Sequence, residues 1–161
     1  MQDVELHFPS DHVFERIARD SALVVARHMG FSDDRTADLQ LAVSEAVTNA
    51  IEHGNRSRTD VKVGVRFLLQ HNRLAVHVID QGGSMPALSR HATPDIDEKL
   101  EDAVPRGLGL FLIEQLVDGV ELHSGPGRTE FTMWFDIKEP RDGAVAGVGE
   151  SLNPVRAGEE K

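Results

Sequence analysis

The chain has no cysteine and comparatively few basic residues. Without cysteine it forms neither a disulfide nor a thiolate metal site, and it has no cysteine nucleophile. Its 17 lysine and arginine residues are outnumbered by 27 aspartate and glutamate residues, which gives a net charge of -10 over 161 residues. A protein that binds a phosphate backbone would have to gather its few cations in one patch, and the sequence contains no such patch. We therefore expect no direct nucleic-acid partner.

Long hydrophobic runs and several catalytic signatures are also missing. No segment is apolar for long enough to span a bilayer, and the first residues, Met-Gln-Asp-Val-Glu, are acidic where a signal peptide would be basic. The eight histidines show no metal-ligand spacing, so a zinc site is not expected. Neither a G-x-S-x-G nucleophile elbow nor a P-loop occurs. These absences predict a cytoplasmic protein without membrane contact, and they argue against a triad hydrolase or a Walker-type NTPase.

The sequence does contain clear helical and strand periodicities. Apolar residues alternate in four segments that we expect to be strands, at 4–8, 61–69, 74–79 and 131–137. Helical periodicity follows Ser10, which we expect to cap the first helix, and follows Ser32 as far as Gly54. One-sided strands with amphipathic helices predict an α+β fold, a two-layer α/β sandwich whose mixed, mostly antiparallel sheet carries helices on one face. The apolar positions that recur near the helical period in the first helix are Val13, Phe14, Ile17, Val24 and Val25.

Two further segments lack this periodicity. Residues 83–106 contain three prolines and mixed charges, which predicts a long loop between a strand and a helix. Residues 138–161 are rich in Gly, Ala and Glu, and we expect them to be a disordered tail. The expected organisation is one domain over residues 1–137 followed by this tail.

A polar line accompanies the apolar stripe of the second predicted helix. Glu45, Asn49 and His53 recur every four residues, so a helix would stack them along one side. Asparagine is a mediocre helix former, and core packing requires none of the three. A carboxamide oxygen suits Mg²⁺, and a carboxylate one turn away could accept a proton from an attacking hydroxyl. Taken singly, each residue is equally compatible with an exposed helix position.

Later segments supply possible partners for this line. Asp80-Gln-Gly82 ends an apolar strand, where a carboxylate could accept a hydrogen bond from an exocyclic amino group and glycine lets a ring approach. The alternative is an ordinary turn. Arg106-Gly107-Leu-Gly109 opens a helix whose unpaired amides form a natural anion site, although it could be a simple helix entry. Thr129 could contact a nucleotide or only occupy a strand.

The order of these motifs resembles a known superfamily. Glu45-x-x-x-Asn49-Ala-Ile-x-His53, Asp80-x-Gly82 and Gly107-x-Gly109-Leu are similar to the N, G1 and G2 boxes of the GHKL, or histidine-kinase-like, ATPases. The run from Val43 to Gly54 and Arg106-Gly-Leu-Gly-Leu-Phe-Leu-Ile113 look more closely like the anti-sigma-factor serine/threonine kinases of RsbW type. The resemblance spans residues 4–137 and implies the Bergerat ATPase fold. Ser84 and Arg128 depart from the superfamily pattern, which has glycine at these positions in many members.

The resemblance implies a role for each motif. Glu45 would be the catalytic base, Asn49 the Mg²⁺ ligand and Asp80 the adenine contact. Gly82 would support the adenine pocket and Gly107 and Gly109 the phosphates, with residues 83–106 as the ATP lid. Apart from the resemblance, Arg106 could reach a terminal phosphate or simply be solvated. We expect His53 to give structural support.

The function that the resemblance implies is an ATP- and Mg²⁺-dependent serine/threonine protein kinase. It would phosphorylate an anti-sigma-factor antagonist of the STAS type and sequester a sigma factor, as a homodimer. The alternative is a non-catalytic module in which ATP only orders residues 83–106 for a partner. A sensor histidine kinase would need a phospho-acceptor helix pair, which this chain lacks.

Overall fold

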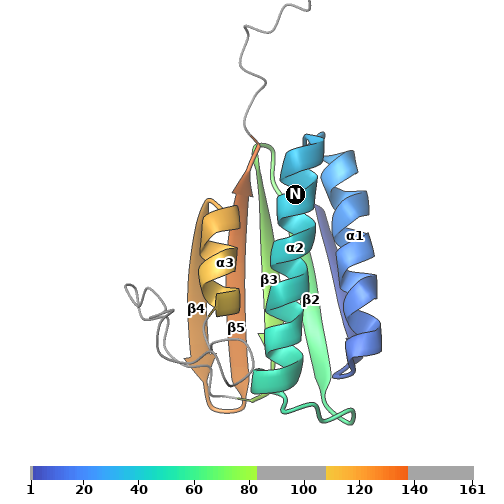
Figure 1. Cartoon of the computed structure of the whole chain (residues 1–161), viewed down its shortest axis with the longest axis vertical. Coiled ribbons are helices and arrows are strands. Elements are labelled where there is room, and N and C mark those ends of the chain that lie inside the picture. The colour runs from blue at the N-terminus through green and yellow to red at the C-terminus, as the bar shows by residue number, and fades with distance from the viewer. Residues whose placement is uncertain (1, 83–107, 138–161) are drawn as a thin grey trace, which may run out of the picture.

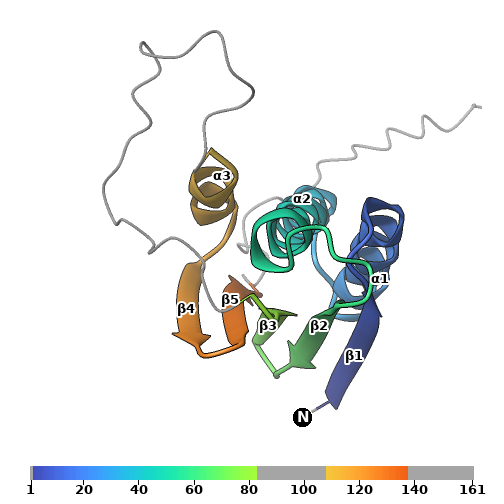
Figure 2. The same cartoon turned by 90° about the horizontal axis from the view of Figure 1, so that it is seen from below.

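The computed structural model describes residues 2–82 and 108–137, which form one antiparallel sheet covered by helices. Three helices lie on one face of the sheet, and none of the described helices covers the other face (Figures 1 and 2). The strand order is β1-β2-β3-β5-β4. The elements are β1 Gln2–Pro9, α1 Glu15–His28, α2 Asp33–Asn49, β2 Lys62–Leu69, β3 Arg73–Asp80, α3 Leu108–Leu116, β4 Gly119–Gly125 and β5 Arg128–Asp136. The predicted two-layer α+β fold is confirmed.

Every strand pairing among the described residues is antiparallel. The predicted hairpin between β2 and β3 is present, and it is closed by the Gln70 amide donating to the Arg73 carbonyl at 2.9 Å. Side chains alternate between the helix-covered face and the open face because the side-chain period of a strand is two. The buried members of this alternation form the core with the helices. They include Val63, Val65, Phe67, Leu74, Val76, Val78, Phe131, Met133 and Phe135.

The predicted cap of the first helix was wrong. Ser10 is buried, and its hydroxyl donates to the Val61 carbonyl at 2.7 Å, so it ties the end of β1 to the chain before β2. Asp11 caps instead, because its side chain accepts from the Val13 amide at the start of a short 3₁₀ turn that leads into α1. Ser32 caps α2 as expected, accepting from the Arg35 amide at 3.2 Å.

The apolar face of α1 also differs from the expectation. Val13, Ile17 and Val24 are exposed, at 73%, 48% and 68%. The buried positions are Ala18, Ala22, Val25 and Ala26, which follow the helical spacing on the opposite side. Small side chains let α1 approach its neighbours closely, so the larger β-branched residues are left on the outside.

The second helix does not end in regular α geometry. A π-helical turn, η2 at Ala50–Gly54, follows Asn49 directly, and the Asn55 amide donates to the Ala50 carbonyl at 2.8 Å. Such turns carry one extra residue per turn and often occur at functional sites. The turn carries the chain from the end of α2 to the ends of β2 and β3, where Gly54 and Asn55 are both buried.

The end of α3 is fixed by Arg35 of α2. Its guanidinium donates to the Leu116 carbonyl at 2.7 Å and pairs with Asp118. It also lies 4.9 Å from the ring centre of Phe135. Because the Arg35 side chain is only 18% exposed, these contacts are largely shielded from water. They hold α3 against α2, and α3 carries Gly109.

Replacing Arg35 by leucine is expected to lower the free energy of unfolding by about 2 kcal/mol or more, because a buried carbonyl and a carboxylate lose a charged donor. Urea denaturation measures this. Arg58→Leu is the control, since Arg58 is an exposed arginine that pairs with Asp60 two residues away and should contribute little. Equal losses in the two variants would contradict this role for Arg35.

No described helix is both long and apolar enough to cross a membrane.

Candidate functional site

Two of the predicted site residues meet a glycine of α3. Glu45 and Asn49 are half-buried and lie one turn apart near the end of α2. A methyl group placed on Gly109 would lie 3.0 Å from Glu45 Oε2 and 3.4 Å from Asn49 Nδ2. The absence of a side chain at Gly109 therefore lets the start of α3 pack closely on the carboxylate and the carboxamide. The sequence predicted this grouping from residues about 60 positions apart.

The amide of Asn49 is chemically unsatisfied in this arrangement. Its Nδ2 atom is buried and has no hydrogen-bond partner among the described residues. Buried polar atoms almost always have a partner, so an orphaned one requires an explanation such as a bound group. The unpaired Asn49 nitrogen lies beside Gly109, so this is a place where a bound group could supply the missing hydrogen bond.

Asp80 occupies an unusual place for a carboxylate. It falls in phase with Leu74, Val76 and Val78 of β3, so its side chain points into the helix-covered layer, and it is 2% exposed. Its Oδ1 accepts from the Gly82 amide at 2.9 Å. Burial raises the pKa of the Asp80 carboxyl, while the Gly82 amide and the Thr129 hydroxyl oppose this shift. A buried acid with one amide donor remains able to accept a further hydrogen bond.

Two glycines make room for Asp80 and the turn that follows it. A methyl group on Gly54 would lie 2.3 Å from Asp80 Cγ, and one on Gly82 would lie 1.8 Å from the Gly54 carbonyl oxygen. The second contact is with backbone, which cannot rotate away as a side chain can. The segment from Asp80 to Gly82 is therefore packed directly on the π-helical turn that follows Asn49, so the acid of β3 and the polar line of α2 belong to one site.

Thr129 joins this site from the neighbouring strand. It is fully buried and lies opposite Asp80 in the register of β3 and β5. The Thr129 hydroxyl favours the charged form of Asp80, yet it lacks a hydrogen bond of good geometry within the described part of the chain. After Asn49 Nδ2, the Thr129 hydroxyl is thus the second buried polar group of this site that can still form a hydrogen bond.

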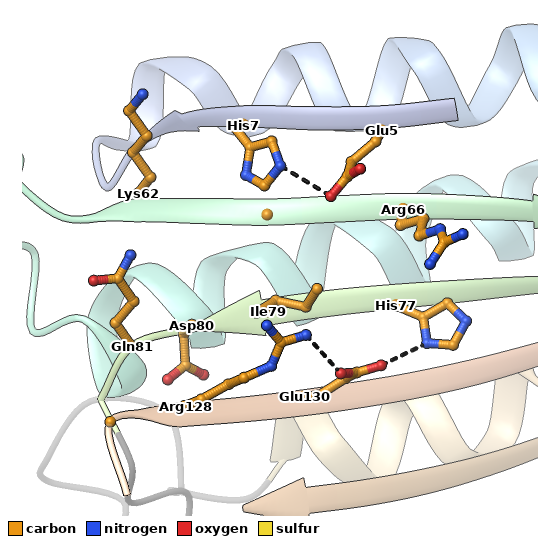
Figure 3. Close-up of a pocket in the computed structure, with 12 residues that line it drawn as sticks. Glu5, His7, Lys62, Arg66, His77, Ile79, Asp80, Gln81, Arg128 and Glu130 are labelled. Atoms are coloured by element: carbon orange, nitrogen blue, oxygen red, sulfur yellow. Dashed lines mark hydrogen bonds and ion pairs between the residues drawn. The ribbon is translucent and has the colours of Figure 1, made fainter. Parts of the chain in front are cut away.

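Arg128, which departs from the superfamily pattern, does not enter this layer. Strand alternation places it on the open face, where its guanidinium donates to Glu130 at 2.9 Å (Figure 3). Glu130 also contacts His77 at 3.0 Å, and the pKa of the Glu130 carboxyl is lowered chiefly by Arg128. A hollow of about 430 Å³ runs across this open face. Much of its charge is already paired, and Asp80 and Gln81 lie at its end (Figure 3).

His53 lies on the π-helical turn that follows Asn49, and its side chain is 53% exposed with Glu52 at 4.0 Å. Its expected role as structural support stays a prediction. Arg106, Gly107 and the predicted lid at 83–106 lie outside the described residues, as does the predicted tail at 138–161.

Sequence reasoning missed two residues of this region. Gly54 was read only as a helix stop, and Asn55 was not considered. Both are buried at the ends of β2 and β3. The only signal in the sequence was that Gly and Asn are both common at the end of a helix, which indicates a helix end but not a buried position.

The residues present fit magnesium held together with a nucleotide. Within residues 2–82 and 108–137, no three His, Asp or Glu side chains gather to hold a metal ion alone. Magnesium usually keeps several waters and takes one or two protein oxygens together with substrate phosphates. The carboxamide oxygen of Asn49 and the neighbouring carboxylate of Glu45 are oxygen groups of this kind, and Gly109 brings the start of α3 close to both without a side chain between them.

Asp80→Asn is expected to keep or raise stability at neutral pH. A raised pKa means that the folded state disfavours the charged form, so stability contributed below pH 3.8 is lost as the pH rises through the raised pKa. Asparagine keeps an oxygen for the Gly82 amide and carries no charge. Urea unfolding from pH 3 to pH 7 should show the variant gaining on the wild type as the pH rises.

A variant that becomes progressively less stable than the wild type over the same range would contradict the assignment of burial as the dominant effect. Asp60→Asn is the matched control. Asp60 is fully exposed and Arg58 lowers the pKa of its carboxyl, so the relative stability of this variant should not rise with pH.

Comparisons with known proteins show which family the chain is similar to. The family model described as the histidine kinase-like ATPase domain matches residues 8–135. The serine-protein kinase RsbW of Bacillus velezensis is 36% identical over 138 residues, covering 78% of this chain and 81% of that protein. The RsbW of Listeria monocytogenes is 35% identical over 145 residues, covering 88% and 92%. That of Bacillus subtilis is 33% identical over 138 residues, covering 78% and 81%.

One solved structure shows the same fold. The crystal structure of the RsbU and RsbW domains of a Mycobacterium tuberculosis protein matches with a TM-score of 0.63 at 21% identity. The match covers 87% of this chain and 33% of that one, so this chain corresponds to about a third of that protein. The names of the sequence relatives favour a kinase over the non-catalytic alternative. The chain therefore belongs to the histidine kinase-like ATPase domain family and, within it, to the serine-protein kinases of RsbW type.

Proposed function

We propose that this chain transfers the γ-phosphoryl group of ATP to a serine or threonine of an anti-sigma-factor antagonist of the STAS type. The observation that carries the proposal is the close approach of Gly109 to Glu45 and Asn49, which brings a carboxylate and a carboxamide with an unpaired nitrogen together with the start of α3. Phosphoryl transfer depends mainly on positioning and on charge stabilisation, and this site offers groups for both.

Glu45 is assigned as the general base. In this role it accepts the proton of the attacking hydroxyl as the bond to phosphorus forms, and the leaving diphosphate carries away the bonding electron pair. Asn49 is assigned as the ligand of magnesium, which, when bound, neutralises charge on the phosphates. Glu45 is half-buried and lies one helical turn before Asn49, so the base and the metal ligand are close together but are separate side chains.

Asp80 is assigned as the acceptor for the exocyclic amino group of adenine. Its low exposure and its single strong amide donor support this role, because the remaining oxygen lone pairs have no other donor of good geometry among the described residues. Gly82 leaves room for the purine ring, and Thr129 contributes its free hydroxyl beside the acid. For the phosphates we assign Gly109 together with Arg106 and Gly107, with residues 83–106 as the ATP lid.

The partners complete the proposal. We assign a sigma factor as the protein that this chain sequesters when its antagonist is phosphorylated, and a homodimer as the active form in the cytoplasm. The similarity to the RsbW kinases supports these assignments.

The test is transfer of label from γ-³²P-ATP. The full chain is incubated with Mg²⁺, labelled ATP and its cognate STAS-type antagonist, and the labelled residue is mapped by mass spectrometry. We expect label on one serine or threonine of the antagonist and none when EDTA removes the metal. Label that stays in ATP, with the cognate antagonist present and correctly folded, would overturn the proposed kinase function.

A further inference from the structure

We propose that Asn55 is a positioning residue that sets the preference of this site for adenine, by fixing the backbone that follows Asp80. The inference rests on the proposed adenine contact of Asp80. Asn55 is 3% exposed and follows the π-helical turn directly. It touches neither Gly109 nor the Asp80 carboxylate in any recorded hydrogen bond, so its effect would pass through the backbone.

The carboxamide of Asn55 joins three strand ends. Its Nδ2 donates to Ser10 Oγ at 2.8 Å and to the Lys62 carbonyl at 3.1 Å. Its Oδ1 accepts from the Gln81 amide at 2.8 Å. Ser10 follows β1, Lys62 begins β2 and Gln81 follows β3. Both amide hydrogens and the oxygen are therefore used, which fixes the orientation of the side chain.

The bond to Gln81 is the one that bears on nucleotide binding. The peptide group that carries this amide joins Asp80 to Gln81, so holding the amide limits rotation of Asp80 about its backbone. Figure 3 shows Asp80 and Gln81 side by side at the end of β3, near the start of β2 at Lys62. On the other side, Asp80 and Gly82 are packed against Gly54, the residue before Asn55. Residues 54 and 55 thus hold the segment 80–82 by packing and by one buried hydrogen bond.

This geometry links Asn55 to base selection. A site that hydrogen-bonds an amino group discriminates strongly against an analogue that lacks it, because the buried acceptor is left unpaired. Inosine triphosphate is such an analogue, since it carries a carbonyl where adenine carries the amino group. If Asp80 loses its fixed direction, the advantage of ATP over ITP falls, whereas contacts to the phosphates are unchanged.

A purely structural role for Asn55 makes a different prediction. Losing any bond of the three-strand junction would then lower stability without altering the choice of base. Ser10→Ala provides the matched control, because Ser10 is 1% exposed and bonds to the same carboxamide from the side away from Gln81. It should lower the free energy of unfolding and leave the ratio of ATP to ITP affinity as in the wild type.

The experiment measures ATP and ITP binding by calorimetry in the full chain with Mg²⁺. Asn55→Ala is expected to reduce the ratio of ATP to ITP affinity by about tenfold or more, with ITP affinity changed far less. Asn55→Ser keeps a hydroxyl in the polar junction but is too short to span both bonds. It should show the same loss of ratio, so it serves if the alanine variant does not fold.

Asp80→Ala, which removes the acceptor, tests the adenine contact separately from Asn55. If it abolishes the preference for ATP while the folded Asn55 variants keep it, the inference about Asn55 is overturned and the adenine contact stands. If Asp80→Ala keeps the preference, the adenine contact itself is overturned, and the inference with it. A loss of preference in both the Asp80 and Asn55 variants, with Ser10→Ala unaffected, supports the inference.

Discussion

Glu45→Gln is expected to slow phosphoryl transfer to the antagonist by about 100- to 10,000-fold, the range typical for loss of a general base. Glutamine is close to glutamate in size, so it fills the same half-buried place beside Gly109 without adding bulk. It cannot accept the proton of the attacking hydroxyl. Because Glu45 is not assigned to the nucleotide phosphates, ATP affinity should stay within about threefold of the wild type, which places the defect in the chemical step. Single-turnover transfer and a separate ATP titration measure the two quantities.

The matched control for this variant is Glu52→Gln. Glu52 lies two helical turns further along, is exposed, and contacts His12 at 3.4 Å on the surface. It should retain the full transfer rate. Equal rates for Glu45→Gln and the wild type would rule out Glu45 as the base, and they would favour a module in which ATP acts only as a ligand.

Gly82→Ala is expected to remove measurable ATP binding. The added methyl group would lie 1.8 Å from the Gly54 carbonyl oxygen, far inside any real contact, and 2.6 Å from its carbonyl carbon. Since the obstacle is backbone, the turn after Asp80 must move, and the buried carboxylate moves with it. A displacement of about 1 Å in a positioned group can cost about 100-fold in function. Equilibrium dialysis with labelled ATP measures the loss.

Gly125→Ala controls for the general effect of removing a glycine. Its methyl group would meet no heavy atom within 4 Å, and its backbone lies outside the left-handed region. It should bind ATP as the wild type does and unfold at a similar urea concentration. If Gly82→Ala also binds ATP normally, the close packing of residues 80–82 on the π-helical turn does not govern the site.

The sheet was predictable because its strands alternate strictly. Three of its central strands bury every second residue, so period two was visible directly in the sequence. Strand β4 at Gly119–Gly125 was not predicted, because it lies at the edge of the sheet and its side chains are mostly half-buried or exposed. A strand with weak burial leaves little periodicity to detect.

The face of α1 was misjudged for a different reason. Large apolar residues dominate the periodicity that predicts a buried helix face, so Val13, Ile17 and Val24 indicated a different face from the one that the alanines form. Of the predicted valines and isoleucine the structure buries Val25 alone, and the other buried positions of α1 are alanines, because close helix packing selects small side chains. The sequence alone does not show that a stripe of small residues is buried while a stripe of larger apolar residues stays on the surface.

The site was predictable to the extent that helical spacing governs it. Glu45 and Asn49 lie on regular α-helix, and their meeting with Gly109 follows the predicted order of motifs. The π-helical turn that follows Asn49 and carries His53 was not predicted, because no residue pattern in the sequence distinguishes it from a regular α-helix. The role of Gly54 and Asn55 depends on tertiary packing against Asp80 and Gln81, which local sequence does not encode.

The most direct test of the central claim is a structure of the full chain with magnesium and a non-hydrolysable ATP analogue. The claim is that Glu45, Asn49, Asp80 and Gly109 surround one nucleotide. We expect Asn49 Oδ1 at about 2.1 Å from the metal and an Asp80 carboxylate oxygen within about 3 Å of the adenine amino nitrogen. A nucleotide bound in the hollow on the open face of the sheet, or a metal held without Asn49, would contradict the account.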